Sequence, residues 1–212
     1  MLLNYLNRYY KKYKCLSYLF LCISFFCLSS QTVAEENNKN LQNVYKLLQE
    51  KNFGDALKEL EALCKENNMQ AQLLYSKILF SGDLTPQDFE TSYFWSSSAL
   101  LGGLKQSNTI IEKLNEYLSE DKIGKIKENL RVFLEKKALN KDKRAIIQIA
   151  KFYETFLEEP DFINAYIWYS IGVAQGIKSA KNKRDEFMNE LNEKELLEAQ
   201  ALSIKLFKQI NN

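Results

Sequence analysis

Apolar side chains recur at intervals of three or four residues along most of the chain after residue 40. Leu74 and Ile78 lie one turn apart within 69–81, and Ile149 and Phe152 do so within 145–157. This spacing is typical of amphipathic α-helices. The chain has only 7 Gly and 2 Pro, which is too few for the frequent turns of a β-sandwich or barrel. The sequence therefore predicts an all-α protein.

The scarcest residue types return at a fixed spacing. The two tryptophans, Trp95 and Trp168, lie 73 positions apart, and the two prolines, Pro86 and Pro160, lie 74 apart. Other residues match at these offsets: Ala71 with Ala145, Tyr93 with Tyr166, and Gly103 with Gly176. A tandem repeat of this length indicates stacked helical units, each burying a face against the next.

Local signals divide each copy into helices. Pro86 and Pro160 each precede a second helix, where a fixed φ suits the first turn, and Gly103 and Gly176 follow it as C-caps. We expect an α-solenoid of about ten helices in antiparallel pairs. The predicted pairs cover about 40–66, 69–103, 106–138 and 144–176, followed by C-terminal helices over 178–210. The last helix opens at Asn192, which has capping-box spacing with Glu195.

Residues 165–169, Ala-Tyr-Ile-Trp-Tyr, followed by Gly176 and Ala180, resemble the second helix of a Sel1-like repeat. Trp95 and Gly103 provide the corresponding match in the first copy, and residues 40–66 resemble a tetratricopeptide unit. The resemblance covers most of 40–205. It implies a superhelix that binds proteins, in a bacterial exported member of the family. Each copy is about twice the usual repeat length, which a divergent intervening helix pair would explain.

The first 34 residues have the features of a secretory signal peptide. Four basic residues precede an uncharged apolar run over 15–28, which is shorter than the roughly 20 residues of a membrane span. Small residues up to Ala34 predict cleavage there, leaving a short linker over 35–39 and a helical-repeat domain over 40–212. We expect a periplasmic or secreted protein. The alternative is a membrane anchor formed by residues 15–28.

Removing residues 1–34 changes the charge and the cysteine content. The whole chain has a formal charge of +2, but the remainder carries 25 basic and 27 acidic residues. Nucleic-acid binding is therefore not expected. Cys64 is then the sole cysteine, so no intrachain disulfide can form, and its apolar surroundings predict a buried, inert thiol.

The sequence contains no recognisable catalytic set. Histidine is absent, which excludes histidine-based nucleophile and acid–base systems. The acidic residues Glu158, Glu159 and Asp161 are expected to complement a helix N-terminus. We predict no catalytic, cofactor-binding or metal-ligating residues, and no cofactor. The alternative is a cell-envelope enzyme that hydrolyses cell-wall material or an amide with carboxylates.

Aromatic residues supply the candidate binding surface. Trp95 and Trp168 are expected to pack between helices, with Pro86, Pro160, Gly103, Gly176, Ala71 and Ala145 as the other structural residues of the repeat. The candidate partner-binding residues, on other faces of the same helices, are Tyr93, Phe94, Tyr166, Ile167 and Tyr169. The alternative, that these are also core residues, remains open. The expected function is a non-enzymatic scaffold with a protein partner.

Basic residues outnumber acidic ones between Lys122 and Arg144. They are either a patch for an anionic partner or envelope surface, or a solvated helix face with pairs at i,i+4 spacing. The second interpretation is the simpler one, because long surface helices commonly carry such pairs.

Overall fold

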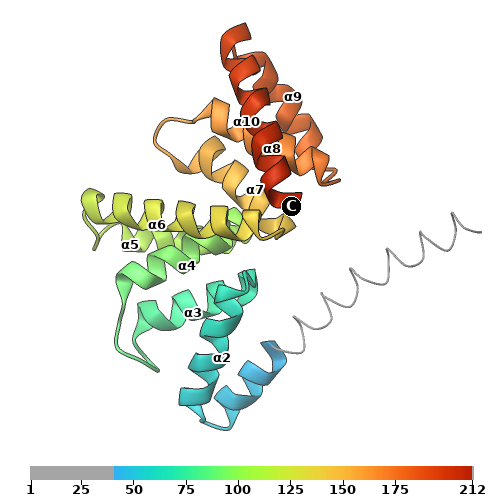
Figure 1. The fold of residues 1–212 in the computed structure, drawn as a ribbon. Coiled ribbons are helices and arrows are strands. Elements are labelled where there is room, and N and C mark those ends of the chain that lie inside the picture. Colours follow the sequence, from blue (N-terminus) through green and yellow to red (C-terminus); the bar gives the residue numbers. More distant parts are fainter. Residues whose placement is uncertain (1–40, 212) are drawn as a thin grey trace, which may run out of the picture. The chain divides into compact units, whose positions relative to one another are not determined.

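A computed structural model describes residues 41–211, which contain helices and no strands (Figure 1). The predicted signal peptide over 1–34 and the linker over 35–39 lie outside the described residues. The chain divides into two compact units, Met1–Ala56 and Leu57–Asn212. The all-α class predicted from the sequence is confirmed.

The described part of the first unit contains a helix over 41–49 and the first turn of α2 (Phe53–Lys65). Between them Lys51 adopts a left-handed conformation with a φ of 59°. The Asn52 side chain donates to the carboxylate of Asp55 at 2.7 Å, which ties the start of α2 to its preceding turn. The predicted pair over 40–66 corresponds to these two helices.

The second unit continues from α2 through ten further helical segments. These are α3 (Met69–Ser81), α4 (Phe89–Leu101), the 3-10 turn η1 (Lys105–Ser107), α5 (Asn108–Leu114), α6 (Glu120–Leu139), α7 (Lys143–Lys151), the π-helical turn η2 (Phe152–Phe156), α8 (Phe162–Ala174), α9 (Ala180–Glu190) and α10 (Glu193–Asn211). None of the described helices is both long enough and apolar enough to cross a membrane.

Side-chain caps fix where these helices begin. Asp88 accepts a hydrogen bond from the Thr91 amide at 3.0 Å, and Asp161 accepts one from the Asn164 amide at 2.9 Å. Pro86 and Pro160 thus lie before the caps rather than in the first turn, because an aspartate takes the capping position. Asn192 and Glu195 exchange two hydrogen bonds of 3.0 Å, which confirms the predicted capping box.

The two copies share backbone details at the predicted spacing. Gly103 and Gly176 both have positive φ, 106° and 77°, a conformation that glycine adopts without steric cost. Their amides donate to Leu100 and Val173 at 2.8 and 3.0 Å, closing α4 and α8 in the same way. The repeat is therefore structural as well as sequential, and residues 57–211 form an α-solenoid array of two tandem copies.

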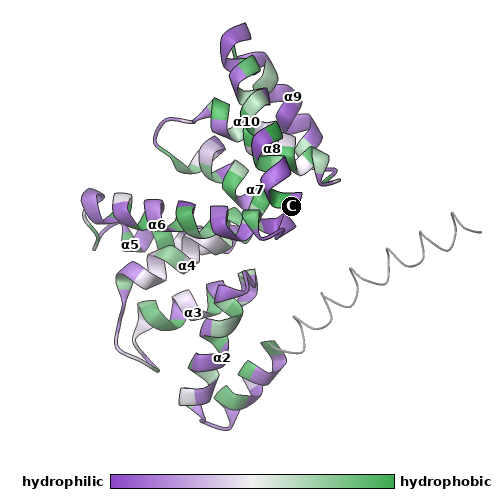
Figure 2. Cartoon of the chain, viewed as in Figure 1, coloured by the Kyte–Doolittle hydropathy of each residue, from purple (hydrophilic) through white to green (hydrophobic). Residues whose placement is uncertain are grey.

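The helices pack most closely around α4 and α8. α4 lies against α3, α5 and α6, whereas α8 lies against α7, α9 and α10. The C-terminal helices α9 and α10 pack on α8 more closely than on each other, so they do not form a further simple pair. Leu130, Ile149 and Trp168 belong to one hydrophobic core that joins α6, α7 and α8. In Figure 2 the hydrophilic α9 contrasts with the hydrophobic residues of α7.

Candidate functional site

The aromatic residues expected at a partner surface lie mostly in the core. Tyr93, Tyr166, Ile167 and Tyr169 are buried, with exposed fractions of 2–5%. Phe94 is partly buried and packs against two cores, one that contains Trp168 and one that contains Leu114. The four buried residues are not exposed to a partner in this structure, because α4 and α8 are each covered by three neighbouring helices. Their position is that of core residues, the alternative that the sequence left open.

The two tryptophans occupy equivalent, buried positions on α4 and α8. Trp95 meets the rings of Phe94 and Phe133 edge-on, with centroids 4.8 and 5.6 Å away. Ala71 and Ala145 are also fully buried at the starts of α3 and α7. Their places agree with the packing role that the sequence predicts for the repeat residues.

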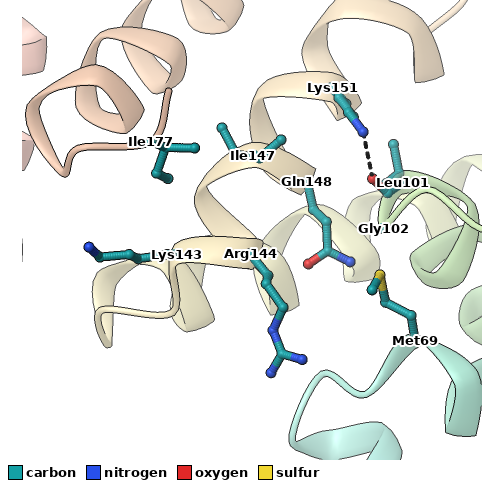
Figure 3. Close-up of a pocket in the computed structure, with 9 residues that line it drawn as sticks. All are labelled: Met69, Leu101, Gly102, Lys143, Arg144, Ile147, Gln148, Lys151 and Ile177. Atoms are coloured by element: carbon teal, nitrogen blue, oxygen red, sulfur yellow. Dashed lines mark hydrogen bonds between the residues drawn. The ribbon is translucent and has the colours of Figure 1, made fainter. Parts of the chain in front are cut away.

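A pocket of about 380 Å³ opens between α7 and the adjoining ends of α3 and α4. Its apolar walls come from Met69, Leu101, Ile147 and Ile177, with Gly102 between them. Figure 3 shows Met69 beside Gly102 across the pocket from α7. The pocket thus lies where the first copy of the repeat meets the second, at a place that neither copy could form alone.

Local sequence explains the shape of this pocket. A Cβ atom on Gly102 would lie 2.6 Å from the Met69 Cγ, so a side chain there would force the methionine to move from its place across the end of α4. On α7, Lys143, Ile147 and Lys151 follow each other at i,i+4 spacing and share one face. Several turns of one helix therefore contribute to the same pocket.

Three cations and no acidic side chain line the pocket: Lys143, Arg144 and Lys151. Each donates to a carbonyl at the end of a different helix. Lys151 reaches Leu101 at 3.5 Å, Lys143 reaches Gln175 at 3.0 Å, and Arg144 reaches Glu66 at 3.4 Å. Cations are favourable at helix C-termini, where carbonyl oxygens lack partners. These contacts hold the three cations beside the pocket.

Asp142 is the acidic group near these cations. Its carboxylate lies 3.7 Å from the Arg144 guanidinium and also accepts the Arg144 amide at 2.9 Å as the N-cap of α7. Within the described part of the chain, no carboxylate forms an ion pair with Lys143 or Lys151. Lys143 and Lys151 are therefore available to an anionic ligand, and Arg144 has only the 3.7 Å ion pair with Asp142.

A buried polar network forms the base of the pocket. The Gln148 side chain donates to the Ser98 carbonyl at 3.0 Å and accepts from the Asn67 side chain at 2.7 Å. Asn67 in turn donates to Asp142 at 3.0 Å and accepts from Gln72 at 3.2 Å. Sequence reasoning missed this network. The sequence feature that could have indicated the network is the presence of Gln72 and Gln148 on helix faces that are otherwise apolar.

The ionisable groups that line the pocket are the amines of Lys143 and Lys151 and the guanidinium of Arg144. The pocket contains no carboxylate, hydroxyl or thiol. Among the described residues, no cluster of three or more His, Cys, Asp or Glu could hold a metal ion. Cys64 is buried elsewhere, and burial raises the pKa of its thiol, which stays protonated at neutral pH. The pocket can accommodate an apolar group that has a negatively charged group beside it.

A second polar cluster joins η2, α8 and α9. The Tyr169 hydroxyl donates to Glu154, whose carboxylate also lies 2.7 Å from the Lys183 ammonium. Burial, followed by the bond to Glu154, raises the pKa of Tyr169, so the phenol stays neutral. The cluster is internally paired, and it is separate from the pocket.

Most of the basic residues on α6 have partners. Lys125 pairs with Asp121 at 2.7 Å, Arg131 pairs with Glu128 and Glu135, and Lys122 pairs with Glu90. These contacts fit a solvated helix face. Lys127 and Lys137 instead lie over the rings of Phe156 and Phe133. Exposed Lys136 and Lys141, at the end of α6 and in the turn that follows, have no carboxylate partner within the described structure.

Comparisons with known proteins give a remote structural likeness. No family model matches the chain, and no curated protein matches it. Among solved structures, it is similar to a protective antigen present in uropathogenic Escherichia coli strains, described as displaying an SLR fold. The two are 16% identical, with a TM-score of 0.36, over 73% of this chain and 41% of that one. The chain thus matches less than half the length of that protein.

Proposed function

We propose that this protein is a non-enzymatic, exported scaffold that binds another protein through its helical-repeat surface. The observation that carries the proposal is the pocket between α4 and α7, which has apolar walls and three cations and is lined by no carboxylate, hydroxyl or thiol. It lies at the junction of two repeat copies, so its geometry depends on the stacking of the array.

The energetics of the pocket suit a protein ligand. Burying one side chain of the size of leucine is worth about 1.5–3 kcal/mol, which alone is too little for a stable complex. A partner must therefore also contact the neighbouring helices. Tandem repeats provide such extended surfaces, whereas an enzyme site needs converging reactive groups.

Binding is tested by affinity capture with the full chain on envelope and culture fractions of the source cells. A recovered protein is then purified and its dissociation constant is measured by titration. Saturable binding of a purified partner is the expected result. Failure to recover any partner, combined with hydrolysis of a cell-wall or amide substrate that is lost on replacing the acidic pair Glu158 and Glu159 by glutamine, would instead support the enzyme alternative.

Export is a separate part of the proposal and rests on residues 1–34. Mass spectrometry of the protein isolated from periplasmic and culture fractions should find an N-terminus at Glu35. An intact N-terminus in the membrane fraction would contradict cleavage and support anchoring through residues 15–28.

A further inference from the structure

We infer that the pocket between α4 and α7 receives an acidic segment of the partner protein, which inserts one apolar side chain and places its carboxylates on Lys143, Arg144 and Lys151. This inference rests on the proposed function and specifies its ligand. It combines two properties of one site, the apolar walls and the cations beside them.

The interior of the pocket selects an apolar side chain. Met69, Leu101, Ile147 and Ile177 surround it, and the polar atoms of Gln148 at its base already bond to Ser98 and Asn67. A polar side chain buried against these apolar walls would lose its water without gaining a hydrogen bond from them. At about 380 Å³, the pocket lies at the small end of ligand sites, which range over about 300–1,000 Å³, and it suits a short peptide stretch.

The charges around the pocket select acidic neighbours for that side chain. Figure 3 shows Lys143 and Arg144 toward one end of the α7 segment and Lys151 at the other. Each cation is held by a different helix end, so the three do not converge on one point. Separate carboxylates along a peptide fit this arrangement better than a single phosphate. Lys136 and Lys141, which precede α7 in the chain, are also exposed, and Asp142 lies in the same turn as Lys141.

The surface near the pocket favours a peptide over a lipid bilayer. Membrane-binding surfaces combine basic residues with large apolar side chains that insert among the lipids. The large exposed apolar residues of the described chain include Val132, Met188, Leu197 and Ile204, and none of them lines the pocket. The charges here accompany a partly open apolar pocket rather than an apolar plane.

The first experiment uses the full chain with ¹³C-labelled methionine methyl groups. Met69 lines the pocket, whereas Met188 lies on α9 and serves as an internal control. The probe is the peptide Asp-Glu-Leu-Glu-Asp, with a serine for leucine version and Lys-Lys-Leu-Lys-Lys as comparisons. The acidic leucine peptide should shift the Met69 signal and leave Met188 unchanged. The serine peptide should bind about tenfold more weakly, and the basic peptide should not bind.

The second experiment removes the pocket cations. The triple variant Lys143→Gln, Arg144→Gln, Lys151→Gln should weaken binding of the acidic leucine peptide by at least about tenfold, and Lys151→Arg should keep it within about twofold. A matched control, Lys122→Gln, Lys125→Gln, Lys127→Gln, removes three charges from α6 and should leave binding unchanged. Thermal unfolding of every variant checks that the fold persists.

Several results would overturn the inference. One is an unchanged Met69 signal, and another is equal weakening of binding by both triple variants. A third is displacement of the peptide by inorganic phosphate or by phosphatidylglycerol vesicles at matched charge, which would assign the site to a phosphate group or a lipid surface. A captured partner that binds the pocket triple variant with wild-type affinity would also overturn it while leaving the proposed scaffold intact. Failure of the scaffold proposal shows separately, as the lack of any saturable protein partner.

Discussion

The two copies of the repeat, α3 to α5 and α7 to α9, have the same backbone turns around different interiors. In both copies the backbone amide of the capping aspartate donates a hydrogen bond to a carbonyl of the preceding helical segment. Asp88 donates to Leu79 at 3.1 Å, and Asp161 donates to Tyr153 at 2.9 Å. The second loop is one residue shorter, and there the first helix of the copy ends in the π-helical turn η2. The turn chemistry is retained although the loop lengths differ.

The interiors differ at matching positions. In the first copy Phe80 packs beside a core that contains Ile110 and Leu114. The second copy has Glu154 and Lys183 at the positions of Phe80 and Ile110, 2.7 Å apart in an ion pair. Charged groups are tolerated near a core when they are paired and hydrogen-bonded. The comparison shows that the capping residues are the same in both copies, whereas the side chains packed inside them differ.

Replacing each tryptophan by alanine is the test of the equivalence of the copies with the largest expected effect on stability. Trp168→Ala should lower the free energy of unfolding by about 3–5 kcal/mol, because it leaves a large cavity in a buried site. Trp95→Ala should cost a similar amount, since Trp95 is also buried and in contact with Phe94 and Phe133. Urea denaturation measures both. A cost below about 1 kcal/mol for Trp95→Ala would show that only the second copy packs through its tryptophan.

The turns before α3 and α7 provide the next test. Asn67 and Lys141 occupy matching positions with φ of 64° and 68°, but only the Asn67 side chain is buried in the polar network. Asn67→Gly should cost about 2–3 kcal/mol, because it leaves buried amide groups unpaired. Lys141→Gly should stabilise the protein by up to about 1 kcal/mol by relieving the left-handed conformation. Chemical denaturation should give opposite signs, and equal effects would mean that the network contributes nothing.

Much of this architecture follows from local sequence signals. Asn192 with Glu195, and the glycines at 103 and 176, act over a few residues and could be predicted, as could the helical period. The pocket could not, because it brings Met69 together with Lys143 and Ile147, which are distant in sequence. The burial of Tyr166 and Tyr169 was also missed. A helix covered on several sides carries apolar residues all around, so periodicity does not reveal which of them faces solvent.

Close packing of α8 is tested by a reciprocal pair of substitutions. A Cβ on Gly172 would lie 3.0 Å from the Ala180 Cβ and 3.3 Å from the Ile147 Cδ1, whereas the first copy has Ala99 at the matching position, fully buried. Gly172→Ala should cost about 1–2 kcal/mol through overpacking, and Ala99→Gly about 1 kcal/mol through helix propensity and lost packing. Gly124→Ala is the control. No atom lies within 4 Å of its added Cβ, so this exposed change should stabilise α6. Stabilisation by Gly172→Ala would mean that α7 and α9 can move apart freely.

The polar interior of the second copy predicts a dependence on alkaline pH. Burial and the bond to Glu154 raise the pKa of Tyr169. Above the ordinary tyrosine pKa of about 10, the unfolded chain loses this proton while the folded chain keeps it. The folded state then binds more protons, so the free energy of unfolding falls as pH rises. The raised pKa of Lys183 acts in the same direction.

Tyr169→Phe separates this contribution from the rest of the protein. At pH 7 it should cost about 1 kcal/mol, the value of the lost hydrogen bond, and it should make the decline in stability above pH 10 less steep. Tyr93→Phe in the first copy removes another phenol whose pKa burial raises. It should also reduce the alkaline slope, but with a smaller cost at pH 7, because Glu154 accepts a hydrogen bond from Tyr169 rather than from Tyr93. Urea denaturation at pH 7, 10 and 11 distinguishes the two. An alkaline slope unaffected by Tyr169→Phe would show that the second copy opens before its tyrosine ionises.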